Sequence, residues 1–306
     1  MKRETLILVE RGLAGASTIE RAVVAMGGRV VCHAHLREAL DVPGVGATLV
    51  LASLEHLLEA EEERLPLERL RNLCVVGDGR AERSQLARLL RISACEHLVL
   101  SASPHLTDQV ALMMATLLRG QRFGLEQYLQ PCGVLEHASV CDLDSRSDAL
   151  ASLALFLTAR GQERRMIART QTVVDELLCN ALLHTARPPG VAVELRYGTD
   201  GRRIGWAVGD AAGALQASVV RSSLARCWQG GPRQLNLTEG GAGLGLFMAH
   251  QQTDQLVFQL SPGRLTQVIG IIDTERSQKN PQVAGSIHIY ASSGDHEPAK
   301  NQGDPP

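Results

Sequence analysis

The chain contains 306 residues, and its hydrophobic content of 44% is enough to bury two separate cores. Lysine and arginine number 31 against 33 aspartates and glutamates, which leaves no basic surplus of the kind that proteins use to bind the phosphate backbone of nucleic acids. We therefore expect two domains, and we do not expect nucleic acid as a partner.

The cysteines and the apolar segments indicate the cellular compartment of the protein. The seven cysteines are scattered and odd in number, with no C-x-x-C pair for zinc or redox chemistry, so we expect free thiols in a reducing compartment. The apolar run at 5–9 and the later apolar stretches at 110–118 and 150–158 are far shorter than the roughly 20 residues of a membrane span. These features predict a soluble, cytoplasmic protein that is not inserted in a membrane.

Residues 1–120 show short apolar runs that alternate with amphipathic helical patterns, as in βαβ units that build a parallel sheet. The pattern resembles the receiver domain of response regulators, a flavodoxin-like doubly wound sheet, which implies an α/β fold for this domain. The expected strands cover 5–9, 29–32, 48–51, 73–76 and 97–100, and the expected helices cover 17–26, 54–64, 82–90 and 106–118.

The positions that carry receiver chemistry hold other residues. Glu10 and Arg11 stand in place of the acidic pair after the first strand, and Ser53 ends the third strand where receivers have the phosphorylated aspartate. Asp78 could substitute for that aspartate, but it follows the fourth strand, and the lysine after the fifth strand is absent from 101–104. We therefore expect a pseudo-receiver that accepts no phosphoryl group and instead binds a protein partner or forms a homodimer.

Beyond a linker at 121–133, the elements of residues 134–276 no longer alternate strictly. A strand segment at 134–143, helices at 148–159 and 163–184, and four later strands at 191–197, 204–208, 255–260 and 266–272 predict an α+β sandwich. Residues 277–306 form a C-terminal extension, which we expect to be disordered after about residue 291 because it is polar and rich in Pro, Gly and Asp.

Three side chains of the second expected helix, Glu176, Asn180 and His184, are four residues apart and share one helical face. A polar stripe on an otherwise apolar helix is either a solvated face or the wall of a binding site. Further along the chain, residues 240–246 are rich in glycine and open a helix, where backbone amides can approach phosphate groups closely.

These segments resemble the sequence boxes of the GHKL superfamily of ATP-binding proteins, and the pattern is nearest to the anti-sigma-factor serine kinases. Glu-x-x-x-Asn-Ala-x-x-His at 176–184 is similar to the N box, and G-x-G-L-G-L at 241–246 is similar to the second glycine box. The resemblance implies a Bergerat-type ATP-binding domain, in which Asn180 binds the Mg²⁺ of Mg-ATP and Glu176 is the catalytic general base. The positions that it assigns to nucleotide binding are Asn180, His184, Asp210, Gly213, Gly241, Gly243, Leu244 and Gly245.

The first glycine box departs from the family pattern. Asp210, which the resemblance assigns to the adenine amino group, is present, but Ala212 and Ala214 occupy the two glycine positions. An alanine at a position that requires positive φ costs on the order of 1 kcal/mol, so we expect a reshaped loop. A simple turn formed by Asp210 is the alternative. Residues 222–238, with Arg226 and Arg233, are the expected ATP lid.

Taken together, these patterns predict a cytoplasmic, ATP-dependent signalling regulator that acts on a protein partner with ATP and Mg²⁺ as cofactors. Two modes of action remain open. Glu176 favours an anti-sigma-type serine/threonine kinase, whereas Ala212, Ala214 and the pseudo-receiver favour a non-catalytic module that binds or sequesters its partner in a nucleotide-dependent way. Autophosphorylation on histidine is not expected, because His137 lies in an expected strand.

Overall fold

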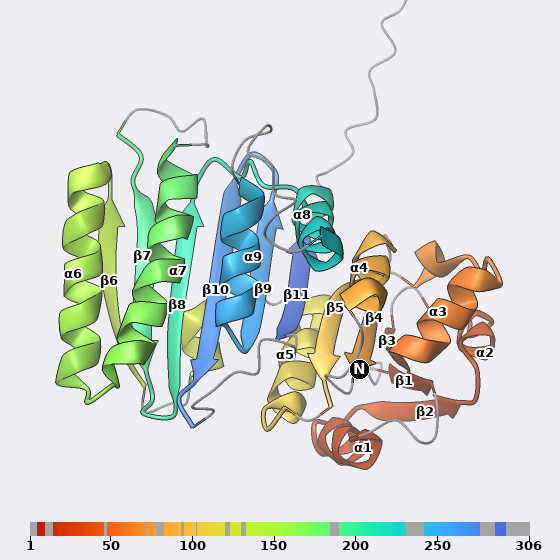
Figure 1. The fold of residues 1–306 in the computed structure, drawn as a ribbon. Coiled ribbons are helices and arrows are strands. Elements are labelled where there is room, and N and C mark those ends of the chain that lie inside the picture. Colours follow the sequence, from red (N-terminus) through yellow and green to blue (C-terminus); the bar gives the residue numbers. More distant parts are fainter. Residues whose placement is uncertain are drawn as a thin grey trace, which may run out of the picture.

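The computed structural model describes residues 5–9, 15–45, 48–70, 72–77, 83–92, 95–101, 103–119, 123–129, 133–183, 190–230, 242–275 and 285–291. It is a mixed α/β structure in which one 11-stranded sheet runs through both halves of the chain, in the order β2-β1-β3-β4-β5-β11-β9-β10-β8-β7-β6 (Figure 1). Within these ranges no helix is both long and apolar enough to cross a membrane.

The N-terminal half contains five parallel strands in the order β2-β1-β3-β4-β5. Helices cover both faces of this part, since separate apolar cores lie on its two sides. All five expected strands are confirmed to within two residues. The strands are β1 (Thr5–Val9), β2 (Arg29–His33), β3 (Leu49–Ser53), β4 (Leu73–Gly77) and β5 (Cys95–Leu100), and the helices are α1 (Ala16–Ala25), α2 (Leu36–Leu40), α3 (Leu54–Glu62), the short η2 (Leu67–Arg69), α4 (Arg83–Arg91) and α5 (Leu106–Arg119).

The C-terminal half contains five antiparallel strands in the order β9-β10-β8-β7-β6, with helices α6, α7 and α9 side by side on one face (Figure 1). The short helix η3 (Leu125–Tyr128) packs on the opposite face, so part of the expected linker belongs to the core. The strands are β6 (Val134–Val140), β7 (Val193–Thr199), β8 (Arg203–Asp210), β9 (Gln255–Ser261) and β10 (Leu265–Asp273), and the helices are α6 (Leu143–Ala159), α7 (Arg164–Leu183), α8 (Ala217–Gly230) and α9 (Ala242–Gln252).

Helix α6 begins five residues earlier than the sequence predicted, because Asp142 caps it. The Asp142 carboxylate accepts a hydrogen bond from the Ser145 amide at 2.8 Å, and the Ser145 hydroxyl accepts one from the Asp142 amide at 3.0 Å. This reciprocal capping box satisfies amides that the first turn of a helix leaves without partners. The expected strand therefore ends at Val140, before residue 143.

Strand β11 (Ser286–Ala291) joins the two halves, although the sequence predicted no strand in the C-terminal extension. It pairs with β9 in parallel over six residue pairs and with β5 in antiparallel orientation over two, Ile287 with Leu98 and His288 with His97. The sheet is therefore continuous across the junction. The expectation of disorder after about residue 291 concerns residues outside the described ranges.

Helix α8 covers the first part of the segment expected as the ATP lid. Residues 222–230 are helical, because Val220, Leu224 and Trp228 recur every fourth residue and bury one apolar face. The helix packs against α4 of the N-terminal half, and Arg221 Nη1 lies 2.9 Å from Glu96 Oε1 on β5. The rest of the expected lid, residues 231–238, lies outside the described part of the chain.

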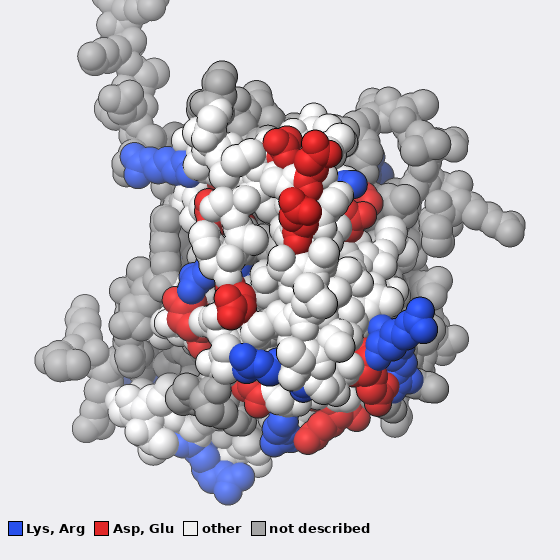
Figure 2. All heavy atoms as spheres, turned by 90° about the vertical axis from the view of Figure 1, so that its left-hand side faces the viewer, with Lys and Arg blue, Asp and Glu red and all other residues white. Residues whose placement is uncertain are grey.

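Strand β6 is the outer edge of the sheet, and Figure 2 views the molecule from this end. Charged side chains gather in the upper and lower parts of this view, while the middle carries few. Glu136 and His137 on the strand are exposed, and the Ser139 hydroxyl donates a hydrogen bond to Glu194 on β7 at 3.0 Å. Polar side chains of this kind discourage an open edge from pairing with other strands.

Candidate functional site

A cavity of about 150 Å³ lies between the sheet and the helices α7 and α9 of the C-terminal half. Its walls are mostly apolar, and its polar lining side chains come from three separate elements, Asn180 on α7, Asp210 at the end of β8 and Thr266 on β10. The apolar lining consists of Leu177, Ala181, Val208, Ala214, Leu215, Leu246 and Val268.

Asn180 and Glu176 on α7 meet the first turns of α9 at Gly245. A Cβ atom added to Gly245 would lie 2.5 Å from Asn180 Nδ2 and 2.5 Å from Glu176 Cγ, so a side chain there would collide with both. The glycine lets α9 approach the polar face of α7 closely. Asn180 Nδ2 is buried and has no hydrogen-bond partner in the described structure. A buried polar atom without a partner is rare in native proteins, which is consistent with a bound ligand at this point.

Glu176 is half-buried on the same helical face as Asn180, one turn towards the N-terminus, but it does not line the cavity. The expected site residues His184 and Gly241 lie outside the described ranges. Gly243 and Leu244 lie in the first turn of α9, which begins beside the two α7 side chains. The start of an α-helix carries unpaired amides and positive dipole, which favour an anionic group there.

Asp210 ends β8 in a tight turn and is 6% exposed. Its Oδ1 atom accepts hydrogen bonds from the amides of Ala212 at 2.9 Å and Gly213 at 3.2 Å. The turn formed by Asp210, which the sequence left as an alternative, is therefore present. Both bonds use one oxygen, so the turn leaves Oδ2 of the cavity-lining carboxylate for another partner.

Thr266 is a lining residue that the sequence analysis missed. It is the cross-strand partner of Asp210, and its Oγ1 accepts a hydrogen bond from the Leu215 amide at 3.4 Å. Four residues further along β10, Gly270 pairs with Trp206 and fixes this register. A Cβ atom on Gly270 would lie 2.0 Å from the ring of Trp206. Only the register of β8 against β10 reveals Thr266, and the sequence alone does not give that register.

The loop after Asp210 has no alanine at a positive φ angle, so the cost that the sequence analysis attached to such a position does not arise. Ala212 and Ala214 both have negative φ angles, and the left-handed residue is Gly213, with φ +58°. A Cβ atom on Gly213 would lie 2.4 Å from the carbonyl oxygen of Ser261 and 2.5 Å from the amide nitrogen of Arg264. The chain thus places its glycine where the backbone requires one.

We expect Gly213→Ala to destabilise the protein by at least about 1–2 kcal/mol, the usual cost of left-handed backbone in a residue with a Cβ atom. The overlap with the backbone at 261–264 adds to this cost. Urea unfolding monitored by circular dichroism measures the loss. The control is Ala212→Gly, which should change stability by no more than about 1 kcal/mol. Equal unfolding midpoints for Gly213→Ala and wild type would contradict this account of the loop.

No protein-family model matches this chain, and no curated protein matches it in sequence.

Proposed function

We propose that the C-terminal half is a GHKL-type ATP-binding domain with a Bergerat fold, and that the protein is a cytoplasmic signalling regulator acting on a protein partner. One observation carries the proposal. Asn180, Asp210 and Gly245 are far apart in the sequence, yet Asn180 and Asp210 line a single cavity. Gly245 lies against Asn180 and Glu176. These positions are the ones that the resemblance to the three sequence boxes assigned to ATP.

The size and lining of the cavity suit the base of the nucleotide. Its volume of about 150 Å³ is below the roughly 300–1,000 Å³ of sites that enclose a whole drug-sized ligand. In the proposal, the apolar walls hold the adenine ring and Asp210 Oδ2 accepts a hydrogen bond from the adenine amino group. The phosphates lie outside the cavity, towards Asn180 and the start of α9.

Asn180 is the residue proposed to hold Mg²⁺. Among the described residues there is no group of three or more His, Cys, Asp or Glu side chains that could hold a metal ion. A divalent cation at this site would therefore take most of its oxygen ligands from the phosphates, with Asn180 supplying an amide oxygen. A flip of the Asn180 amide exchanges Nδ2 and Oδ1, so its oxygen can take the position that faces the cation.

For the N-terminal half we propose a flavodoxin-like pseudo-receiver. Its parallel strand order, β2-β1-β3-β4-β5, is that of flavodoxin-like doubly wound sheets. Ser53 ends β3, where a receiver has its phosphorylated aspartate, and its hydroxyl accepts a hydrogen bond from the His56 amide to cap α3. Three further positions compared with receivers, Glu10, Arg11 and Asp78, lie outside the described ranges.

Two modes of action remain, transfer of phosphate to a serine or threonine of the partner, and nucleotide-dependent binding of that partner. One argument for a purely binding role was the alanine at two glycine positions of the first glycine box, and neither Ala212 nor Ala214 has a positive φ angle. Glu176 is half-buried beside the start of α9, close to the proposed phosphate position. Replacing Glu176 with glutamine distinguishes the two modes.

Calorimetry with Mg-ATP tests the proposed site. The full chain is the right material, because β11 pairs with β9 and a shorter segment would lose this strand. We expect Asn180→Ala to weaken Mg-ATP binding by roughly 10- to 100-fold, as for loss of a contact to a charged group. Thr172→Ala, at an exposed position of the same helix, is the control and should bind as wild type does. Identical heats for wild type and Asn180→Ala would refute the assignment.

A further inference from the structure

A second cavity, of about 310 Å³, lies where the two halves of the chain meet. It shares no lining residue with the first cavity. One wall comes from α5 of the N-terminal half and from the segment around η3, and the other comes from the first residues of β8 and β9. Neither the motifs nor the proposed function accounts for this space.

Gln109 on α5 lines this cavity and carries a buried polar atom without a partner. The residue is 4% exposed, its Nε2 lies 3.3 Å from the hydroxyl oxygen of Ser103, and its Oε1 has no hydrogen-bond partner in the described structure. Rotating the amide would only exchange the two ends, because a serine hydroxyl can bond to either. An unpaired buried amide costs about 1–3 kcal/mol, so a ligand that pairs with it gains affinity.

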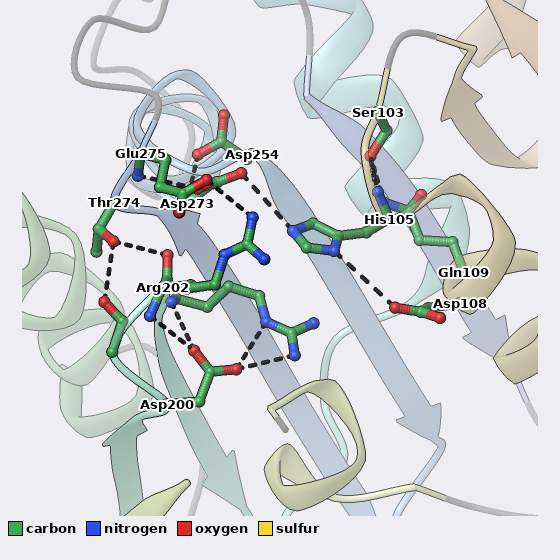
Figure 3. A network of polar contacts seen from close by, with 12 residues as sticks. Ser103, His105, Asp108, Gln109, Asp200, Arg202, Asp254, Asp273, Thr274 and Glu275 are labelled. Carbon is green, nitrogen blue, oxygen red and sulfur yellow. Dashed lines mark hydrogen bonds and ion pairs between the residues drawn. The ribbon is translucent and has the colours of Figure 1, made fainter. Parts of the chain in front are cut away.

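Arg203 supplies a buried positive charge that is held in a fixed position. The residue is 8% exposed, and its Nε and Nη2 atoms both lie 2.9 Å from Oδ2 of Asp200, whose side chain is fully buried. Figure 3 shows Asp200 at the centre of this network, where its other oxygen accepts backbone amide bonds. The ion pair does not use Nη1, so this end of the guanidinium can bind a carboxylate.

Carboxylates outnumber cations around the cavity. His105 lies between two of them, with Nδ1 3.9 Å from Asp108 and Nε2 3.7 Å from Asp273 (Figure 3). Burial lowers the pKa of His105, and nearby Arg203 lowers it further, so the imidazole is neutral at pH 7. Arg202 also lies near the imidazole and is paired with Glu275. With Asp200, four carboxylates therefore lie around two guanidiniums. This balance disfavours an anion such as phosphate and favours a ligand that also carries an amino group.

We propose that the junction cavity binds a free amino acid. Its carboxylate faces Arg203, its ammonium group faces the exposed carboxylate of Asp108, and Gln109 pairs with a polar group of the ligand. Leu112 and Leu129 form an apolar part of the wall. Because both halves of the chain line the cavity, a bound ligand stabilises their junction.

The proposal is tested on the full-length protein by titration calorimetry with each of the twenty common L-amino acids and with inorganic phosphate. We expect at least one amino acid to bind and to raise the thermal unfolding midpoint, while phosphate does neither. Asp108→Asn should weaken that binding at least tenfold. Asp144→Asn is the matched control, because Asp144 is exposed and also lies in the first turn of its helix.

A second variant keeps the test independent of folding. Gln109→Leu removes the unpaired Oε1 atom together with the hydrogen bond between Nε2 and Ser103, so it should unfold within a few degrees of wild type, yet bind the amino acid at least tenfold more weakly. Three outcomes would overturn the proposal. They are no binding by any of the twenty amino acids, binding of phosphate at the site, or equal affinity in wild type, Asp108→Asn and Gln109→Leu.

Discussion

Acidification from pH 7.5 to 5.0 should destabilise this protein by about 4 kcal/mol through two histidines at the junction of its halves. His97 on β5 is 2% exposed and His288 on β11 is 1% exposed. They are cross-strand partners whose ring centroids are 5.7 Å apart, and none of their four ring nitrogens has a hydrogen-bond partner in the described structure. Both rings are therefore held in a site that disfavours positive charge.

Burial lowers the pKa of His97 to about 3, and burial together with the neighbouring His97 lowers the pKa of His288 well below its usual value. In the unfolded chain both groups titrate near pH 6.5, so below that pH the unfolded state binds protons that the native state excludes. The protein therefore keeps its full stability above about pH 6.5, and its free energy of unfolding falls as the pH drops from there towards the native pKa values. Each histidine contributes a slope of about 1.4 kcal/mol per pH unit.

Urea unfolding at pH 7.5 and pH 5.0 measures this effect. In the double variant His97→Leu/His288→Leu, most of the loss of stability on acidification should disappear, because leucine has a similar size and does not titrate. His35→Leu, at an exposed position, should respond to acid as wild type does. If the double variant loses as much stability as wild type between the two pH values, the two buried histidines are not the cause.

The pairing of His97 with His288 could not have been predicted from the sequence. The five parallel strands of the N-terminal half could, because each is an apolar run bounded by turn residues. Strand β11 carries His288 and Tyr290 among isoleucines, and its partners β5 and β9 lie far away in the sequence. The alternation of Ile287 and Ile289 with polar residues is compatible with a strand, but no local pattern encodes its partners.

The candidate site shows the same division between local and non-local information. The spacing of Glu176 and Asn180 follows from the helix period, and the structure has both on one face of α7. The roles of Ala212 and Gly213 depended on which residue has positive φ, and that in turn depends on the contacts of the loop with residues 261–264. The place of Thr266 in the cavity lining depends on the register of β8 against β10, which again is a property of the folded chain.

The second large effect expected concerns Glu176, and it rests on the proposed function. If the protein is a kinase, Glu176→Gln should lower phosphotransfer to the partner by roughly 10²- to 10⁴-fold, the usual loss when a general base is removed. Mg-ATP affinity should change little. Glutamine has the shape of glutamate, so it keeps the close contact with Gly245 and leaves Asn180 in place.

The measurement is transfer from labelled ATP to the partner recovered by pull-down, with Asp175→Asn as the control. Asp175 is the adjacent carboxylate on α7, where it lies 3.2 Å from Arg146 and does not line the cavity, so its amide variant should transfer phosphate as wild type does. If wild type labels nothing above the level of Glu176→Gln, phosphotransfer is excluded. The binding module would then be supported if Asn180→Ala removes the nucleotide dependence of partner binding while Glu176→Gln preserves it, because only the asparagine is proposed to hold Mg²⁺.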